Sequence, residues 1–180
     1  MIFEPLPLAG AFRVRLEKLG DGRGTFARTF CVREFAAQGL NINWPQCNTS
    51  FNTTQGTLRG LHWQAEPNGE DKLVRVTRGA LWDVLVDLRR DSPTFCRWHG
   101  EELDADSGTS LYIPRGFAHG FVTLKNDTEI FYQMSAFYEP HSARGARFDD
   151  PAFAIRWPVS GLIVSDRDQA FPPFDKNAGA

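Results

Sequence analysis

Short runs of strand-forming residues, separated by turns, do most to limit the folds open to this chain. The runs span residues 11–16, 57–64, 72–77, 80–88, 110–113, 121–124 and 129–138. Gly, Pro, Asn, Asp and Ser cluster between them, as at residues 77–79, 91–93 and 125–127. Many short strands at such spacing are typical of a closed barrel or a double-sheet jelly roll. We therefore predict an all-β fold of this kind.

Helical pattern is confined to a short segment. Residues 32–38 form the only convincing helix, with Gly39 as a C-terminal cap. The tail that follows Trp157 and Pro158 is rich in Pro and Asp, so we expect it to wrap the barrel as a loop or short helix. A length of 180 residues suits one domain with a sizeable core. We predict a single domain over residues 1–180.

Charge and composition argue against several classes of function. The net charge is -2 and the basic residues are scattered, so no positive field favours nucleic acid. No apolar run has the length of a membrane span, and the N-terminus lacks the pattern of a secretory signal. The cysteines, Cys31, Cys47 and Cys96, lack C-x-x-C spacing. We expect a reduced cytoplasmic protein with free thiols.

Lys72 stands on an otherwise apolar strand face. It is in phase with Val74 and Val76, because side chains alternate between the two faces of a strand. An ammonium group on such a face raises the free energy of folding unless it has a partner or a task. With His62 on a nearby strand, Lys72 indicates a polar site inside the β-structure, although a lysine at a strand start can also extend its amine to water.

His62 shares its strand face with Gly60 and Gln64, so strict alternation would point Arg59 the other way. A β-bulge at Gly60 would bring Arg59 and His62 to the same side, which is common beside active sites. A buried structural histidine that hydrogen-bonds a neighbour is the alternative. The residue types leave both open.

Two further segments carry candidate site residues. The turn at residues 113–116 leads into a strand that contains His119, with aromatic residues on both sides. In the run 129–138, Tyr132 and Tyr138 share a face with Ile130 and Met134. If that face is buried, each phenol needs a hydrogen-bond partner; plain aromatic packing is the alternative.

A bound metal is not favoured by the histidine pattern. Metal-binding β-barrels of this type carry an H-x-H pair, whereas His62 is followed by Trp63 and Gln64. His99 and His141 lie in polar, turn-like contexts. We therefore expect no metal ligands in this chain, and the common nucleotide-binding and nucleophile motifs are also missing.

Several sequence blocks in a fixed order resemble a known family. They are RGLHWQ (59–64), KLV (72–74), DVLVDLR (83–89) with SPT (92–94), PRGFAHGF (114–121), DP (150–151) and WP (157–158). Together they resemble the dTDP-4-dehydrorhamnose 3,5-epimerase family of nucleotide-sugar epimerases, over about residues 20–168. The resemblance implies a cupin-type jelly roll, a homodimer and no cofactor. It also implies a nucleoside-diphosphate 4-keto-6-deoxy sugar as substrate, in deoxysugar biosynthesis.

The resemblance also implies a role for each site residue. His62 would be the base, Tyr132 the acid on the opposite side of the sugar, and Lys72 the group that binds the keto oxygen and stabilises the enolate. Asp168 would pair with His62, with Asp166 as a second candidate. The residues implied to line the sugar, diphosphate and nucleotide region are Arg23, Phe26, Gln46, Asn48, Arg59, His119 and Tyr138.

Departures from the family pattern lie in the recognition residues. Arg28 stands where a glutamate is usual, Asn52 replaces the last serine of a Q-x-N-x-S-x-S pattern, and Glu70 stands where a glutamine usually precedes the lysine. These changes leave open a CDP-linked or other non-thymidine substrate. They also leave open two other reactions, inversion at C3 or C5 alone and sugar ketoisomerisation. A non-catalytic nucleotide-sugar-binding cupin is the alternative from another class, although binding alone needs no general base.

Overall fold

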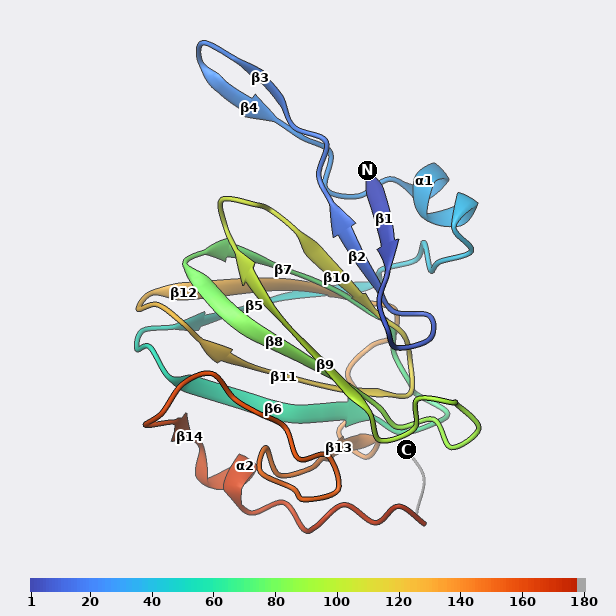
Figure 1. Cartoon of the computed structure of the whole chain (residues 1–180). Coiled ribbons are helices and arrows are strands. Elements are labelled where there is room, and N and C mark those ends of the chain that lie inside the picture. Colours follow the sequence, from blue (N-terminus) through green and yellow to red (C-terminus); the bar gives the residue numbers. More distant parts are fainter. Residues whose placement is uncertain (178–180) are drawn as a thin grey trace.

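Two mostly antiparallel sheets lie face to face in the computed structural model, which describes residues 1–177 (Figure 1). One sheet has the order β1–β2–β10–β7–β12–β5, and the other has the order β13–β6–β11–β8–β9, with β14 beside β6. The strands of the first sheet are β1 (Ile2–Pro5), β2 (Phe12–Arg15), β5 (Gln46–Asn52), β7 (Lys72–Arg78), β10 (Ser110–Ile113) and β12 (Thr128–Met134). Those of the second are β6 (Thr57–Gln64), β8 (Ala80–Asp87), β9 (Trp98–Asp104), β11 (Phe117–Thr123), β13 (Ala143–Gly145) and β14 (Ile163–Val164). The predicted jelly roll is confirmed.

The main core fills the space between the sheets, because alternate residues of the facing strands are apolar. Val74 and Val76 of β7 and Ile130 of β12 pack with Leu81 and Leu85 of β8, and all are buried. Burial of each such side chain contributes about 1.5–3 kcal/mol. This core holds the two sheets at a fixed separation, and the polar site lies beside it between the same sheets.

The outer faces of both sheets are covered in part. Phe35 of α1 (Val32–Ala37) packs on Leu73 of the first sheet. The C-terminal segment covers the second sheet, where Phe153 lies among residues that include Val84 and Val86. Strand β8 is therefore buried on both faces, which explains its nearly continuous apolar sequence.

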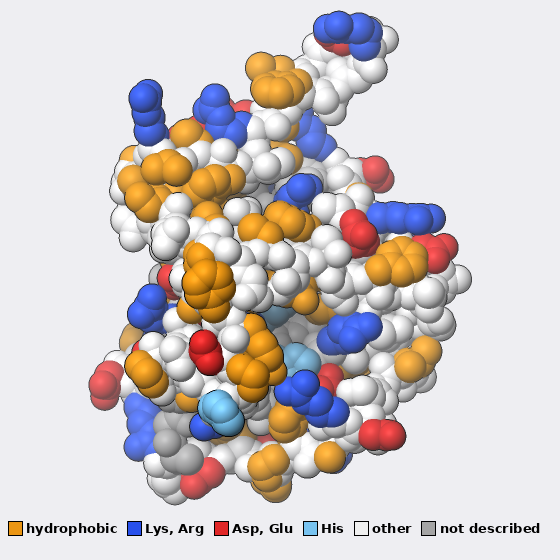
Figure 2. All heavy atoms as spheres, turned by 180° about the vertical axis from the view of Figure 1, so that it is seen from behind, with side chains coloured by type: hydrophobic (Ala, Val, Ile, Leu, Met, Phe, Trp, Pro, Cys, Tyr) orange, Lys and Arg blue, Asp and Glu red, His pale blue; other side chains and the backbone are white. Residues whose placement is uncertain are grey.

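A hairpin arm projects from the body of the molecule (Figures 1 and 2). It consists of β3 (Leu19–Asp21) and β4 (Gly24–Phe26). The Asp21 carboxylate accepts hydrogen bonds from the backbone and guanidinium of Arg23, which closes the turn at its tip. The arm carries Leu19 and Phe26 as exposed apolar side chains.

Most of the predicted elements are confirmed, with corrected ends. The helix ends at Ala37, and Gly39 has φ +69° as a cap requires. The run 129–138 was predicted too long: β12 ends at Met134, because its neighbour β7 begins at Lys72 directly opposite. Strand β11 begins at Phe117, earlier than predicted, and β5 and β9 were not predicted.

The tail folds back on the barrel, as expected, through β14 and the short helix α2 (Asp166–Gln169). Residues 178–180 of the predicted domain lie outside the described residues. Between residues 1 and 177, no helix is both long and apolar enough to cross a membrane.

Candidate active site

A β-bulge in β6 brings Arg59 and His62 to the same side of the sheet. His119 of β11 pairs with His62 and Phe121 pairs with Arg59, so β6 contains one extra residue in this stretch. Gly60 is required here: its φ is +119°, and a Cβ would lie 2.6 Å from Gly120 Cα. The bulge that the sequence left open as a possibility is therefore present in the structure.

His62 is paired with Asp168 across 106 residues of sequence. Its Nε2 lies 2.8 Å from Asp168 Oδ1, and Asp168 Oδ2 accepts a hydrogen bond from the Gly60 N–H at 3.0 Å. Burial opposes ionisation of Asp168, but these hydrogen bonds outweigh it and hold the pKa of the carboxyl below its usual value. An ionised carboxylate only accepts, so Nε2 carries the proton of the neutral ring and Nδ1 is the nitrogen able to accept one.

The short helix α2 places this carboxylate. Ser165 caps the helix by accepting a hydrogen bond from the Asp168 N–H, and Asp168 is buried. Phe171, just after the helix, packs edge-on against the His62 ring with centroids 5.9 Å apart. Between the two candidates, Asp168 is the residue that contacts His62.

Lys72 lies inside the site and does not extend to solvent. The residue is 9% exposed, and its Nζ lies 3.1 Å from Glu70 Oε1. The amine therefore has a carboxylate partner within the site.

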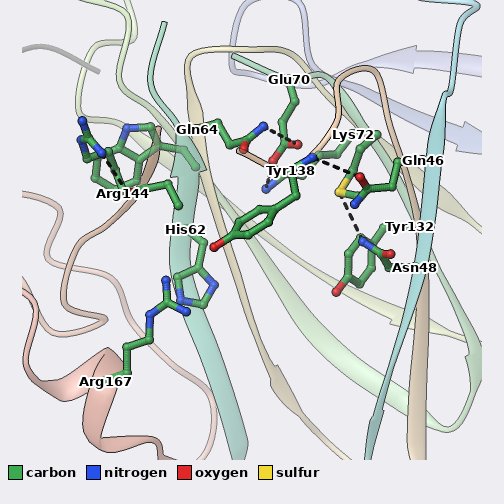
Figure 3. Close-up of a pocket in the computed structure, with 13 residues that line it drawn as sticks. Gln46, Asn48, His62, Gln64, Glu70, Lys72, Tyr132, Tyr138, Arg144 and Arg167 are labelled. Carbon is green, nitrogen blue, oxygen red and sulfur yellow. Dashed lines mark hydrogen bonds and ion pairs between the residues drawn. The ribbon is translucent and has the colours of Figure 1, made fainter. Parts of the chain in front are cut away.

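Six of the candidate residues line a cavity of about 400 Å³ (Figure 3). His62 enters it from β6, Lys72 from β7 and Tyr132 from β12, while Tyr138 lies across it on the segment after β12. Burial is the main cause that raises the pKa of Tyr132, so its phenol keeps its proton. Gln46 and Asn48 of β5 complete this side of the cavity. The space-filling view shows histidine side chains inside a hollow on one face of the molecule (Figure 2).

A neighbouring compartment of about 220 Å³ is lined by the same His62, Lys72 and Tyr132 together with Arg59 and His119. Arg59 Nε donates to Asn52 Oδ1 at 2.7 Å, so the residue that replaces the family serine orients this guanidinium. His119 Nε2 lies 2.9 Å from a carboxylate oxygen of the buried Asp83. The two compartments together form one site of size suited to a small ligand.

Arg23 and Phe26 are the candidate residues that a single chain does not bring to this cavity. Both lie on the projecting arm and line a separate surface hollow, and Phe26 is 72% exposed. Their predicted contact with a ligand therefore cannot be made with the cavity of the same chain in this conformation.

Several cavity residues were not among the predicted site residues. Gln64, Glu70, Arg144 and Arg167 all line the larger compartment. Gln64 could have been found, because it shares the strand face of His62, and Arg167 precedes Asp168. Arg144 gives no local signal. Among residues 1–177, no group of three or more His, Cys, Asp and Glu side chains is arranged to hold a metal ion.

Comparisons with known proteins identify the family of this chain. The family model described as dTDP-4-dehydrorhamnose 3,5-epimerase matches residues 5–176. A dTDP-4-dehydrorhamnose 3,5-epimerase from Sinorhizobium fredii is 43% identical over 173 residues, covering 96% of this chain and 89% of the relative.

Solved structures of epimerases are also similar to this chain. A dTDP-4-dehydrorhamnose 3,5-epimerase from Bacillus anthracis with TDP and PPi bound superposes with a TM-score of 0.93 at 37% identity, covering 96% of this chain and 99% of that chain. A 3'-monoepimerase from Streptomyces bikiniensis in complex with dTDP-quinovose has a TM-score of 0.87 at 33% identity, covering 94% and 86%. The chain is thus an isomerase that belongs to the dTDP-4-dehydrorhamnose 3,5-epimerase family.

Proposed function

We propose that the protein inverts C3, C5 or both in a dTDP-linked 4-keto-6-deoxy sugar, without a cofactor, through an enolate. The observation that carries this proposal is the convergence of His62, Lys72 and Tyr132 on one cavity, with Asp168 behind the histidine. A base, a cation and a phenol in one cavity are the groups this reaction needs.

Proton removal begins at His62. The C4 ketone acidifies the C–H bonds at C3 and C5, and His62 Nδ1 takes one of these protons. The Asp168 carboxylate holds the ring in the tautomer that leaves Nδ1 free, and stabilises the imidazolium that forms. The electron pair of the broken C–H bond moves into the C–C bond and onto the keto oxygen, which becomes an enolate oxygen.

Lys72 and Tyr132 act on this enolate. The Lys72 ammonium donates to the keto oxygen as negative charge develops there, in a site largely withdrawn from water. Tyr132 then returns a proton to the carbon from the opposite side, which inverts the configuration. Its partly buried phenol is protonated at neutral pH, as an acid must be. Solvent then accepts the proton that His62 gained and returns a proton to Tyr132.

Nucleotide contacts would come from the mouth of the cavity. Tyr138 offers an exposed aromatic ring for the base, and Arg59 offers a guanidinium for the diphosphate. The thymidine nucleotide is favoured because relatives and solved neighbours are named for dTDP-linked substrates. A second candidate, inversion at one carbon alone, is supported by the likeness to a 3'-monoepimerase.

Deuterium uptake tests the proposal. The protein is incubated in heavy water with a dTDP-linked 4-keto-6-deoxyhexose, and label at C3 and C5 is read by NMR. Label at both carbons supports double inversion, and label at one supports the second candidate. CDP-, UDP- and GDP-linked sugars compare the bases. If every sugar binds but none takes up deuterium, the enzymatic proposal is refuted and the protein is a nucleotide-sugar-binding cupin.

We further propose a homodimer in which the arm of each chain reaches the cavity of the other. The resemblance assigns Arg23 and Phe26 to the ligand, yet they lie on the arm outside their own chain's cavity. Mixing two inactive variants, Arg23→Ala and His62→Ala, should restore activity, because one site of a mixed dimer then has both residues. A monomer by light scattering, or no recovery on mixing, would contradict this.

We also propose that the protein works in the cytoplasm, where exposed thiols such as that of Cys47 stay reduced. Fractionation of the producing cells, with detection of the protein by antibody, tests this location.

A further inference from the structure

Glu70 is a carboxylate inside the cavity that has no task in the proposed reaction. It comes two residues before Lys72, where glutamine is usual in the family, and its side chain is 8% exposed. A carboxylate withdrawn from water is unfavourable unless its oxygens are hydrogen-bonded or paired with a cation. The partners of its two oxygens therefore indicate what this residue does.

Each oxygen of Glu70 contacts a different donor (Figure 3). Oε1 lies 3.1 Å from Lys72 Nζ, and Oε2 accepts a hydrogen bond from Gln64 Nε2 at 3.2 Å. The carboxylate therefore bridges the amine of β7 and the side-chain amide at the end of β6.

The orientation of Gln64 is determined by the segment after β12. Its Oε1 accepts from the Glu139 N–H at 2.6 Å, and its Nε2 donates to the Phe137 carbonyl at 3.1 Å. If the amide were reversed, its NH₂ would face the Glu139 N–H and its oxygen would face the Phe137 carbonyl, so Nε2 must be the atom that faces Glu70. Gln64 Nε2 also donates to the Asn68 carbonyl at 3.1 Å, so its two hydrogens are shared among three acceptors, of which Glu70 Oε2 is one. Position 70 thus faces two donors, Gln64 Nε2 and the Lys72 amine. A carboxylate offers one oxygen to each, whereas a glutamine has a single acceptor oxygen.

The same contacts hold Tyr138. Gln64 binds the backbone on both sides of this residue, and Gln46 Oε1 accepts from the Tyr138 N–H at 3.0 Å. The segment that lies across the cavity is thus attached to both sheets, through Gln64 of β6 and Gln46 of β5. Glu70 connects Lys72 to this attachment.

We propose that Glu70 is a positioning residue: it holds the Lys72 amine toward the keto oxygen and, with Gln64, couples that amine to the segment that carries Tyr138. The proposal rests on the proposed role of Lys72 in binding the keto oxygen. A lysine has a flexible stem and three N–H donors. Glu70 takes one donor and limits the stem to one direction, and the other donors remain for the substrate. Stabilisation of an enolate depends on donors that are in place before charge develops.

The test compares Glu70→Gln and Glu70→Ala with a control, Glu102→Gln, which removes an exposed carboxylate from β9. Steady-state exchange in heavy water gives kcat and KM, and titration with dTDP gives Kd. We expect both Glu70 variants to lower kcat about 10- to 100-fold, less than the roughly 10²- to 10³-fold effect of losing an oxyanion donor outright. The Kd for dTDP should stay within about threefold, and the control should match the wild type.

A kcat equal to that of the wild type in both Glu70 variants would overturn the proposal, as would equal losses of kcat and dTDP binding. The nearly isosteric Glu70→Gln variant carries the test if Glu70→Ala does not fold.

A spectroscopic readout separates this inference from the proposed function. With lysine labelled at ¹³Cε, the Lys72 signal is distinguished from those of Lys18, Lys125 and Lys176. It should shift in Glu70→Gln while the others do not, whether or not the wild type catalyses exchange. An unmoved Lys72 signal would refute the positioning role even in an active enzyme.

Discussion

Replacement of Asp168 by asparagine should leave His62 in place but put its proton on the wrong nitrogen. The carbonyl oxygen of the new amide would keep the hydrogen bond from the Gly60 N–H, which now binds Oδ2 at 3.0 Å. The amide NH₂ would then face His62 Nε2, now 2.8 Å from Oδ1. Because an NH₂ group donates, Nε2 becomes the acceptor and Nδ1 takes the proton. The nitrogen proposed as the base is no longer free.

The size of the effect follows from two losses. Loss of a hydrogen bond to a charged group costs about 1.5–3 kcal/mol. Attraction between imidazolium and carboxylate is about 4 kcal/mol for charges 4 Å apart at an effective dielectric constant of 20. Since the His62 side chain is 39% exposed, solvent screening reduces that attraction to roughly 1–2 kcal/mol. A total of about 4 kcal/mol corresponds to a rate loss of roughly 10³-fold.

The assay is initial-rate deuterium incorporation from heavy water, beside a titration with dTDP. Asp168→Asn should lose exchange and keep its dTDP affinity. Asp166→Asn is the matched control, because it removes a carboxylate from the same helix while the Asp168–His62 pair is retained. Exchange by Asp168→Asn within threefold of the wild type, or equal losses in both variants, would refute the tautomer argument.

Three other variants test separate parts of the structure. Tyr132→Phe should slow product formation more than deuterium uptake, because the return of a proton to the carbon needs the phenol. Equal slowing of product formation and deuterium uptake would argue against Tyr132 as the acid. Gly145→Ala should displace Phe171, whose Cζ would lie 2.1 Å from the new Cβ, and so disturb the packing of Phe171 on His62. Thermal melting should show that the free energy of unfolding falls by about 1–3 kcal/mol, and deuterium exchange should be slower. An unchanged melting curve would count against this packing. Burial, followed by the nearby Asp71 carboxylate, raises the pKa of Tyr112 to about 12. The unfolded chain therefore ionises first as pH rises from 10 to 12, and about 3 kcal/mol of stability should be lost in that window. Urea unfolding at several pH values should show that loss in the wild type and not in Tyr112→Phe.

The class of fold could be predicted because strand patterns are local. The run 57–64 matches β6 at both ends, and the run 110–113 matches β10. Strand β5 was missed although inward and outward residues alternate along it, because polar residues such as Gln46 and Asn48 occupy its inward positions. Its inner face belongs to the site more than to the core, so hydrophobicity did not reveal it.

The extent of β12 shows a limit of another kind. Residues 135–138 have strand-like character, but a strand ends where its neighbours no longer offer hydrogen-bonding partners. Strand β7 begins opposite Met134. One residue further, the Ser135 N–H donates to the Asp71 carbonyl, but the Asp71 N–H donates to the Ser135 side chain, which ends the ladder. That boundary depends on the neighbouring strand and not on the segment itself.

About as much of the candidate site as of the fold could be predicted from the sequence. Lys72 was found as a charge on an apolar face, and Gly60 was found as the position of a bulge, since both signals lie within a few residues. The identity of the carboxylate behind His62 could not be decided, because Asp166 and Asp168 differ only in which face of a four-residue helix they occupy.

By itself, the sequence determined the β-architecture, the family and most of the residues around the cavity, because strand periodicity and ordered motifs are properties of short segments. Only the tertiary structure decided which ring nitrogen of His62 is free, which oxygen of Glu70 contacts which donor, and that Arg23 and Phe26 lie outside the cavity of their own chain. These are relations between segments as far apart as residues 62 and 168. They arise when packing brings the segments together, and no local pattern encodes which side chain of a distant segment then lies opposite.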